Sequence, residues 1–131
     1  MGIPLPDRAK QILDDKNFAH VATLMRDGSP QVSPVWVYRH GDEVMISTGV
    51  DRIKTRNLKR DPRVAVSIAP VDAPFPPLLL RGRLVELITG EPAVDGFVEA
   101  TKKYTGAEPA NRPPAAERVV YRIEVTHCNL K

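Results

Sequence analysis

The basic segment from Asp51 to Arg63 is the part of the chain best suited to bind a ligand. Its sequence, DRIKTRNLKRDPR, predicts about two turns of helix that stop before Pro62. Arg52 and Lys54 place positive charge at the N-terminal end of this helix, which the helix dipole already makes positive. An anion would compensate that charge, and the free N–H groups of the first turn would bind a phosphate. Asn57, one turn further on, could donate another hydrogen bond.

The rest of the segment has simpler interpretations. Lys59 and Arg60 lie near the C-terminal end of the expected helix, where cations complement the dipole without any ligand. A solvated basic helix is therefore one alternative, and a nucleic-acid binder is another, since the segment carries six basic residues against two acidic ones. Aromatic residues make up only 5% of the chain, and basic and aromatic residues are not interleaved. We therefore expect no nucleic-acid partner.

Length and composition indicate the kind of protein that positions this segment. A chain of 131 residues fits a single domain over 1–131, and 42% hydrophobic with 27% charged residues is typical of a globular protein. No apolar run is long enough for a membrane helix, and the N-terminus lacks the apolar core of a signal peptide, so we expect no membrane association and a cytoplasmic location. The lone Cys128 has no Cys or clustered His nearby, so no metal site is expected.

Hydrophobic spacing predicts a mainly β protein. Alternating apolar residues and Asp-Gly or Gly-Asp turns indicate six strands, at about 18–25, 30–38, 43–48, 64–68, 78–88 and 119–125. Helical spacing indicates two to three short helices, at about 5–13, 52–60 and between Gly90 and Gly106. Strands and helices do not alternate regularly, which favours a closed or nearly closed antiparallel barrel over a parallel sheet.

Three stretches in order along the chain carry a family resemblance: VATLMRDGSPQVSPVWV, EVMIST and RIKTRNLKRDPRVAVSI. With them the chain resembles the pyridoxamine-5'-phosphate oxidase-like split β-barrel family, in particular its small deazaflavin-dependent branch. The resemblance implies a six-stranded antiparallel split β-barrel of the FMN-binding type. It also implies a homodimer with its cofactor sites at the subunit interface.

The resemblance further implies roles for ten residues of the chain. The cofactor phosphate would bind to Arg52 and Lys54, with Ile53 and Asn57 lining the same pocket. Ser47 and Thr48 would donate hydrogen bonds nearby. The strand that lies along the tricyclic ring would contribute Gln31, Ser33, Val35 and Trp36.

The end of the chain and the basic helix favour one cofactor. Pyridoxamine-phosphate oxidases proper carry a C-terminal basic and aromatic substrate segment, whereas this chain ends in THCNLK, which argues against a vitamin-phosphate substrate. Coenzyme F-420 has a phosphodiester and an acidic tail, which a basic rim of Arg56, Lys59 and Arg60 would suit. We therefore expect the deazaflavin F-420, with FMN as the alternative.

The expected function is hydride transfer from the reduced cofactor to an unsaturated small organic substrate. The cofactor ring supplies the hydride, so no catalytic side chain is required. The chain lacks the sequence motifs of a nucleophile elbow, a P-loop or a dinucleotide site. Two alternatives use the same pocket: an FMN-dependent oxidoreductase and a non-catalytic cofactor carrier.

Overall fold

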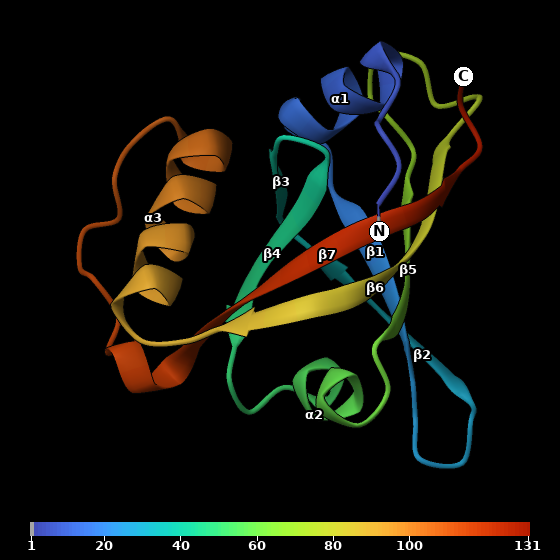
Figure 1. The fold of residues 1–131 in the computed structure, drawn as a ribbon. Coiled ribbons are helices and arrows are strands. Elements are labelled where there is room, and N and C mark those ends of the chain that lie inside the picture. The colour runs from blue at the N-terminus through green and yellow to red at the C-terminus, as the bar shows by residue number, and fades with distance from the viewer. Residues whose placement is uncertain (1) are drawn as a thin grey trace.

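Seven antiparallel strands form one sheet that curls back on itself in the computed structural model, which describes residues 2–131. The strands are β1 (Ala19–Leu24), β2 (Pro30–Val35), β3 (Val37–His40), β4 (Glu43–Gly49), β5 (Arg63–Ile68), β6 (Leu78–Ile88) and β7 (Arg118–Cys128). Their order across the sheet is β2-β1-β5-β6-β7-β4-β3. Three α-helices, α1 (Asp7–Asp14), α2 (Ile53–Arg60) and α3 (Glu91–Thr105), and a short 3₁₀ turn (Ala115–Glu117) surround it (Figure 1).

The expected strand over 30–38 is divided in two, which corrects the strand count from six to seven. The chain breaks at Trp36, so that β2 pairs with β1 while β3 pairs with β4. These two consecutive strands therefore form opposite edges of the sheet, and the short connection between them closes the barrel. Pro30 and Pro34 both lie in β2, where an edge strand tolerates residues without a backbone N–H.

The hydrophobic core fills the inside of the curled sheet. Val21, Val37, Ile46 and Tyr121 are fully buried there, each on a different strand. In α1 the residues at helical spacing, Ala9, Ile12 and Leu13, are fully buried against one open end of the barrel. Helix α2 covers the other end with Leu58 (Figure 1). The barrel is thus plugged at one end by α1 and at the other by the basic helix.

Helix α3 packs on the outside of the barrel, against β7, β4 and β3. A second, smaller core lies between them and includes Tyr38, Met45, Ala93 and Val120. Gly96 allows the helix to come close, because a Cβ at this position would lie 2.5 Å from both the Tyr38 hydroxyl oxygen and Val120 Cγ2. This close packing brings the next residues of α3 near the end of the barrel that α2 covers.

None of the helices within residues 2–131 is long and apolar enough to cross a membrane.

Candidate functional site

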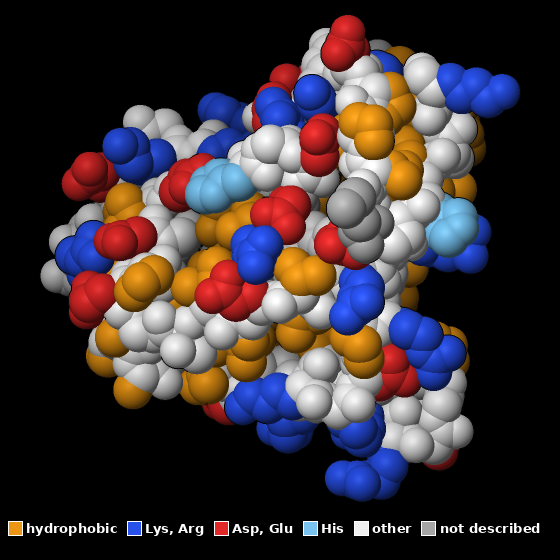
Figure 2. Space-filling model, in the orientation of Figure 1, with side chains coloured by type: hydrophobic (Ala, Val, Ile, Leu, Met, Phe, Trp, Pro, Cys, Tyr) orange, Lys and Arg blue, Asp and Glu red, His pale blue; other side chains and the backbone are white. Residues whose placement is uncertain are grey.

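The first turn of α2 has the features of an anion site. Arg52 is the N-cap residue, its side chain caps no backbone group, and the first turn contains no acidic residue. The backbone N–H groups of Ile53 and Lys54 donate to no other described residue. Lys and Arg side chains gather at this end of the molecule (Figure 2). Free N–H groups, the helix dipole and two cations therefore converge at one place.

A buried hydrogen-bond chain fixes the start of α2 on the sheet. Thr55 Oγ1 donates to the backbone oxygen of Gly49 at 3.0 Å, at the end of β4. The hydroxyl of Tyr121, from β7, donates in turn to Thr55 Oγ1. Burial raises the pKa of Tyr121 to about 12, so this hydroxyl keeps its proton at neutral pH. The direction of α2 is thus set by two neighbouring strands of the barrel.

Two adjoining hollows lie beside this helix start. The first, of about 470 Å³, is lined by Gln31, Ser33, Asp51, Arg52, Ile53 and Lys54. The second, of about 440 Å³, is lined by residues 33–36, 47–49, Arg52, Lys54, Phe97, Ala100 and Arg118. They share Ser33, Arg52 and Lys54. Each has the size of a small-molecule site, and together they offer a continuous cleft for a ligand with a charged end and a flat body.

The cations of the cleft, Arg52, Lys54 and Arg118, form no ion pair with a described carboxylate. Lys54 is 9% exposed and has no ion pair or hydrogen bond from its ammonium group to another described residue. Burial, and then the nearby charge of Arg52, lowers the pKa of Lys54 below its ordinary value. The same two causes lower the pKa of Arg118, which the charge of Glu117 partly opposes. A bound anion would relieve both effects.

Unpaired buried polar atoms point to the same place. Among the described side chains, three buried atoms lack a hydrogen-bond partner: Gln31 Oε1, Ser33 Oγ and Arg118 Nε. All three belong to residues that line the two hollows. Leaving such an atom buried and unpaired costs about 1–3 kcal/mol. The residues present therefore fit a ligand that carries both hydrogen-bonding groups and negative charge.

An aromatic wall closes one side of the second hollow. The rings of Trp36 and Tyr104 are stacked, with centroids 4.9 Å apart and planes 7° apart. The Tyr104 hydroxyl accepts from the backbone N–H of Val37 at 3.2 Å and donates to the backbone oxygen of Asn17. Trp36 is therefore held in place by α3 at the break between β2 and β3, which suits it to contact a flat ligand.

Nine of the ten residues expected at the site line the two hollows: Gln31, Ser33, Val35, Trp36, Ser47, Thr48, Arg52, Ile53 and Lys54. Sequence reasoning missed Arg118 and Phe97, which reach the second hollow from β7 and α3. Ser47 differs from expectation in its present partner, because its hydroxyl accepts from Arg118 Nη2 at 2.9 Å. The sequence carries no local signal for Arg118, whose role depends on the pairing of β7 with β4.

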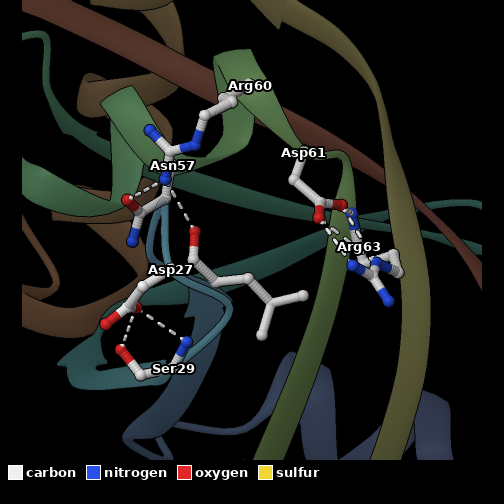
Figure 3. A network of polar contacts seen from close by, with 7 residues as sticks. Asp27, Ser29, Asn57, Arg60, Asp61 and Arg63 are labelled. Atoms are coloured by element: carbon white, nitrogen blue, oxygen red, sulfur yellow. Dashed lines mark hydrogen bonds and ion pairs between the residues drawn. The ribbon is translucent and has the colours of Figure 1, made fainter.

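Asn57 is the exception, because it lies outside both hollows. Its amide nitrogen donates to Thr23 Oγ1 at 3.0 Å. Its amide oxygen accepts from Arg60 at 3.0 Å (Figure 3). Arg60 also donates to the backbone oxygen of Leu24 at 3.0 Å. Asn57 is buried in the face of α2 that packs on β1, so it fastens the helix to the barrel. The structure therefore does not bring Asn57 together with the other nine residues, and its expected place in the phosphate pocket stays a prediction.

The remaining chemistry-bearing residues form no second centre. His40 contacts Glu99 at 2.9 Å on the surface, and His127 Nδ1 lies 3.0 Å from Thr126 Oγ1. Within residues 2–131, no group of three or more His, Cys, Asp or Glu side chains could hold a metal ion. The cleft beside α2 is thus the candidate site.

Solved structures with this fold cover almost the whole chain. One is an F-420 reductase, with a TM-score of 0.83 and 28% identity over 95% of this chain and 98% of its own. Another is a conserved hypothetical protein from Mycobacterium tuberculosis, with a TM-score of 0.75 and 22% identity over 97% and 84%. A third, from Listeria innocua, is assigned as a pyridoxamine 5'-phosphate oxidase, with a TM-score of 0.73 and 21% identity over 94% of each chain. These likenesses confirm the split β-barrel class, with seven strands here.

The family follows from the sequence match. The family model for pyridoxamine 5'-phosphate oxidase matches residues 5–131. The chain therefore belongs to the pyridoxamine 5'-phosphate oxidase family, as its three characteristic stretches predicted.

Proposed function

We propose that the protein is an oxidoreductase that binds the deazaflavin coenzyme F-420 and transfers a hydride from it to an unsaturated small organic substrate. In this proposal Arg52, Lys54 and the first N–H groups of α2 bind the cofactor phosphate. The adjoining hollow, with Val35 and Trp36 on its wall, receives the flat part of the ligand.

One observation carries the proposal. Among the described residues, every buried side-chain nitrogen or oxygen atom that lacks a hydrogen-bond partner belongs to a residue lining the cleft where Arg52 and Lys54 lie. A fold that needed no ligand would pair these groups or expose them, because each unpaired atom costs free energy. A phosphate at the start of α2 would compensate both cations, and its oxygens would accept from the free N–H groups.

The chain's own residues would bind and orient the reactants. When bound in its reduced form, the deazaflavin supplies the hydride; the substrate also takes up one proton, which water can provide. Val35, Trp36 and Phe97 offer apolar surface that excludes water from the reacting atoms. Thr48 and Ser47, at the end of β4, offer hydroxyl groups that orient the ligand. No side chain of the cleft needs to act as an acid or base.

The preference for F-420 over FMN rests on charge. Arg56 and Lys59 are exposed on α2, the helix whose N-terminus is the proposed phosphate site, and would attract the acidic tail of F-420. FMN has no such tail. The likeness to a solved F-420 reductase supports the same choice. Arg60 contributes less to this rim than expected, because its guanidinium group is engaged with Asn57 and Leu24.

Paired titrations test the proposal. We expect the protein to bind F-420 more tightly than FMN, measured by calorimetry in the same buffer, and to consume reduced F-420 when an enone is added, followed by its absorbance. Tighter binding of FMN than of F-420 would identify FMN as the cofactor and favour the FMN-dependent alternative. Tight binding of F-420 without substrate-dependent oxidation, across a panel of enones, would favour a cofactor carrier.

We further propose that the protein acts as a homodimer through the outer face of β1, β2, β5 and β6. Val32 and Leu79 are 63% and 48% exposed there, and both line a shallow hollow of about 720 Å³. Val32 projects from β2 on the side opposite Gln31 and Ser33, because side chains alternate along a strand. A second copy on this face would therefore contact the side of β2 opposite the one that lines the cofactor cleft.

A charge on this face should separate the subunits. We expect light scattering to give twice the 14.5 kDa chain mass for the wild type and the single mass for Val32→Glu. Lys16→Glu, a charge change near the end of α1, is the control and should leave the dimer intact. A monomeric wild type would contradict the proposal.

A further inference from the structure

We propose that Arg118 binds a carboxylate group of the substrate, so that the substrate class is an α,β-unsaturated carboxylic acid. This inference rests on the proposed function, because it names the substrate class of the same cleft. It depends on the position of Arg118, on its unpaired donors and on the apolar surface beside it.

The guanidinium group of Arg118 is held in one orientation. Arg118 is the first residue of β7 and lies opposite Gly49 of β4. Its Nη2 donates to Ser47 Oγ at 2.9 Å, and its guanidinium carbon lies 4.6 Å from the centroid of the Phe97 ring. A hydrogen bond on one side and a cation–π contact on the other thus fix the plane of the group. Such an orientation prepares the side chain to receive a ligand.

The guanidinium group has more donors than partners. It carries five N–H donors, and only the bond to Ser47 is made with a described residue. Its Nε is buried and unpaired. Arg118 forms no ion pair with a described carboxylate, although Glu117 is its neighbour in the chain. The nearby charge of Arg52 adds to the positive potential. An unpaired, partly buried guanidinium is costly unless a ligand completes its bonds.

The shape of the hollow favours a carboxylate on a hydrocarbon chain. A planar guanidinium matches a carboxylate through two parallel hydrogen bonds. The second hollow, where Arg118 lies, also presents Phe97 and Ala100, which suit a short apolar chain beside the flat part of the cofactor. Arg118 does not line the first hollow, where the phosphate is proposed to bind. The cleft can therefore hold two anionic groups at separate places.

Trp36 provides a direct readout. It is the only tryptophan of the chain and lies on the wall of this hollow, so its fluorescence reports on ligands that bind there. The full-length protein without cofactor is titrated with trans-2-hexenoate and with its neutral counterpart, trans-2-hexenamide. We expect the acid to bind about tenfold more tightly than the amide or better, as one charged hydrogen-bond pair would give.

Four variants, one of them a control, locate the carboxylate. Arg118→Gln should weaken binding of hexenoate to the level of the amide, while binding of the amide stays unchanged. Arg118→Lys, which keeps the charge but loses the planar pair of donors, should give an intermediate affinity. Arg26→Gln, in the exposed hairpin turn, is the matched control and should behave as the wild type. Lys54→Ala should reduce the difference between acid and amide less than Arg118→Gln does, because Lys54 lines both hollows whereas Arg118 lines the second alone.

Equal binding of acid and amide by the wild type would overturn the inference, as would a difference that survives in Arg118→Gln. A larger loss of the difference in Lys54→Ala than in Arg118→Gln would also overturn it, because the carboxylate would then lie at the phosphate site. The titration contains no cofactor, so its result is independent of whether F-420 binds. Conversely, turnover of neutral enones with F-420 would uphold the proposed function even if hexenoate failed to bind.

Discussion

Replacing Lys54 with alanine should weaken binding of F-420 by about 1.5–3 kcal/mol, a loss of roughly ten- to 150-fold in affinity. The reason is that Lys54 is one of two cations beside the free N–H groups of α2 and has no other partner among the described residues. Removing it therefore removes a charged hydrogen bond to the phosphate without breaking a bond within the protein. Calorimetric titration of wild type and variant measures the difference.

Two matched variants separate a lost phosphate contact from a general loss of charge. Lys16→Ala removes the same charge near the end of α1, at the opposite end of the barrel, and should leave the affinity unchanged (Figure 1). Lys54→Arg keeps a cation at the site and should retain most of the affinity. The free energy of unfolding should change little in Lys54→Ala, because no bond within the protein depends on its ammonium group. An unchanged affinity for F-420 in Lys54→Ala would contradict the proposal that the cofactor phosphate binds at the start of α2.

The pH dependence of binding should carry the signature of Lys54. Burial and Arg52 lower the pKa of its ammonium group in the free protein, whereas a bound phosphate raises it again. When the pH is above the pKa that Lys54 has in the free protein, binding of F-420 therefore takes up protons. The affinity for F-420 falls as the pH rises through that pKa. At lower pH the lysine is charged in both states and contributes no slope. In Lys54→Arg the guanidinium stays charged, so the alkaline fall in affinity should disappear.

Local patterns in the sequence predicted much of this site because its basic helix is a local feature. The end of α2 before Pro62 follows from proline chemistry, and the unusual position of Arg52 and Lys54 follows from the helix dipole. The alternation of Gln31 and Ser33 along β2 placed both on one face of the strand. Such features need only a few neighbouring residues, so the sequence alone specifies them.

Features that depend on distant partners were not predictable in the same way. The run from Pro30 to Tyr38 reads as one strand, because nothing local shows that Trp36 moves the chain from one edge of the sheet to the other. Asn57 was placed at the ligand because only its helical spacing was visible, whereas Thr23 on β1 holds its amide. Arg118 is a single arginine at a strand start, and its place in the second hollow emerges only when β7 pairs with β4.

Replacing Gly82 with alanine should destabilise the protein by about 3 kcal/mol, at the upper end of what overpacking costs. Gly82 lies in β6 opposite Val125 of β7, next to a shift in strand register. An added Cβ would lie 2.1 Å from the backbone oxygen of Glu124 and 3.2 Å from the Cα of Val125. A backbone atom cannot rotate away as a side chain can, so the two strands must separate locally. Urea unfolding followed by circular dichroism measures the loss.

Gly41→Ala provides the reference for this variant. Gly41 has a φ of +60° with no atom within 4 Å of an added Cβ, so its substitution costs only backbone strain, about 1–2 kcal/mol. The loss of stability in Gly82→Ala should exceed that value; a smaller loss would mean that β6 and β7 can shift apart at little cost.

The ligand site should respond differently from the fold. Arg118 and Tyr121 lie near the start of β7 and pair with β4, away from Val125. Molecules of Gly82→Ala that remain folded should therefore bind F-420 with the affinity of the wild type. This result would show that the strands supporting the cleft keep their positions when the far end of the β6–β7 pair is strained.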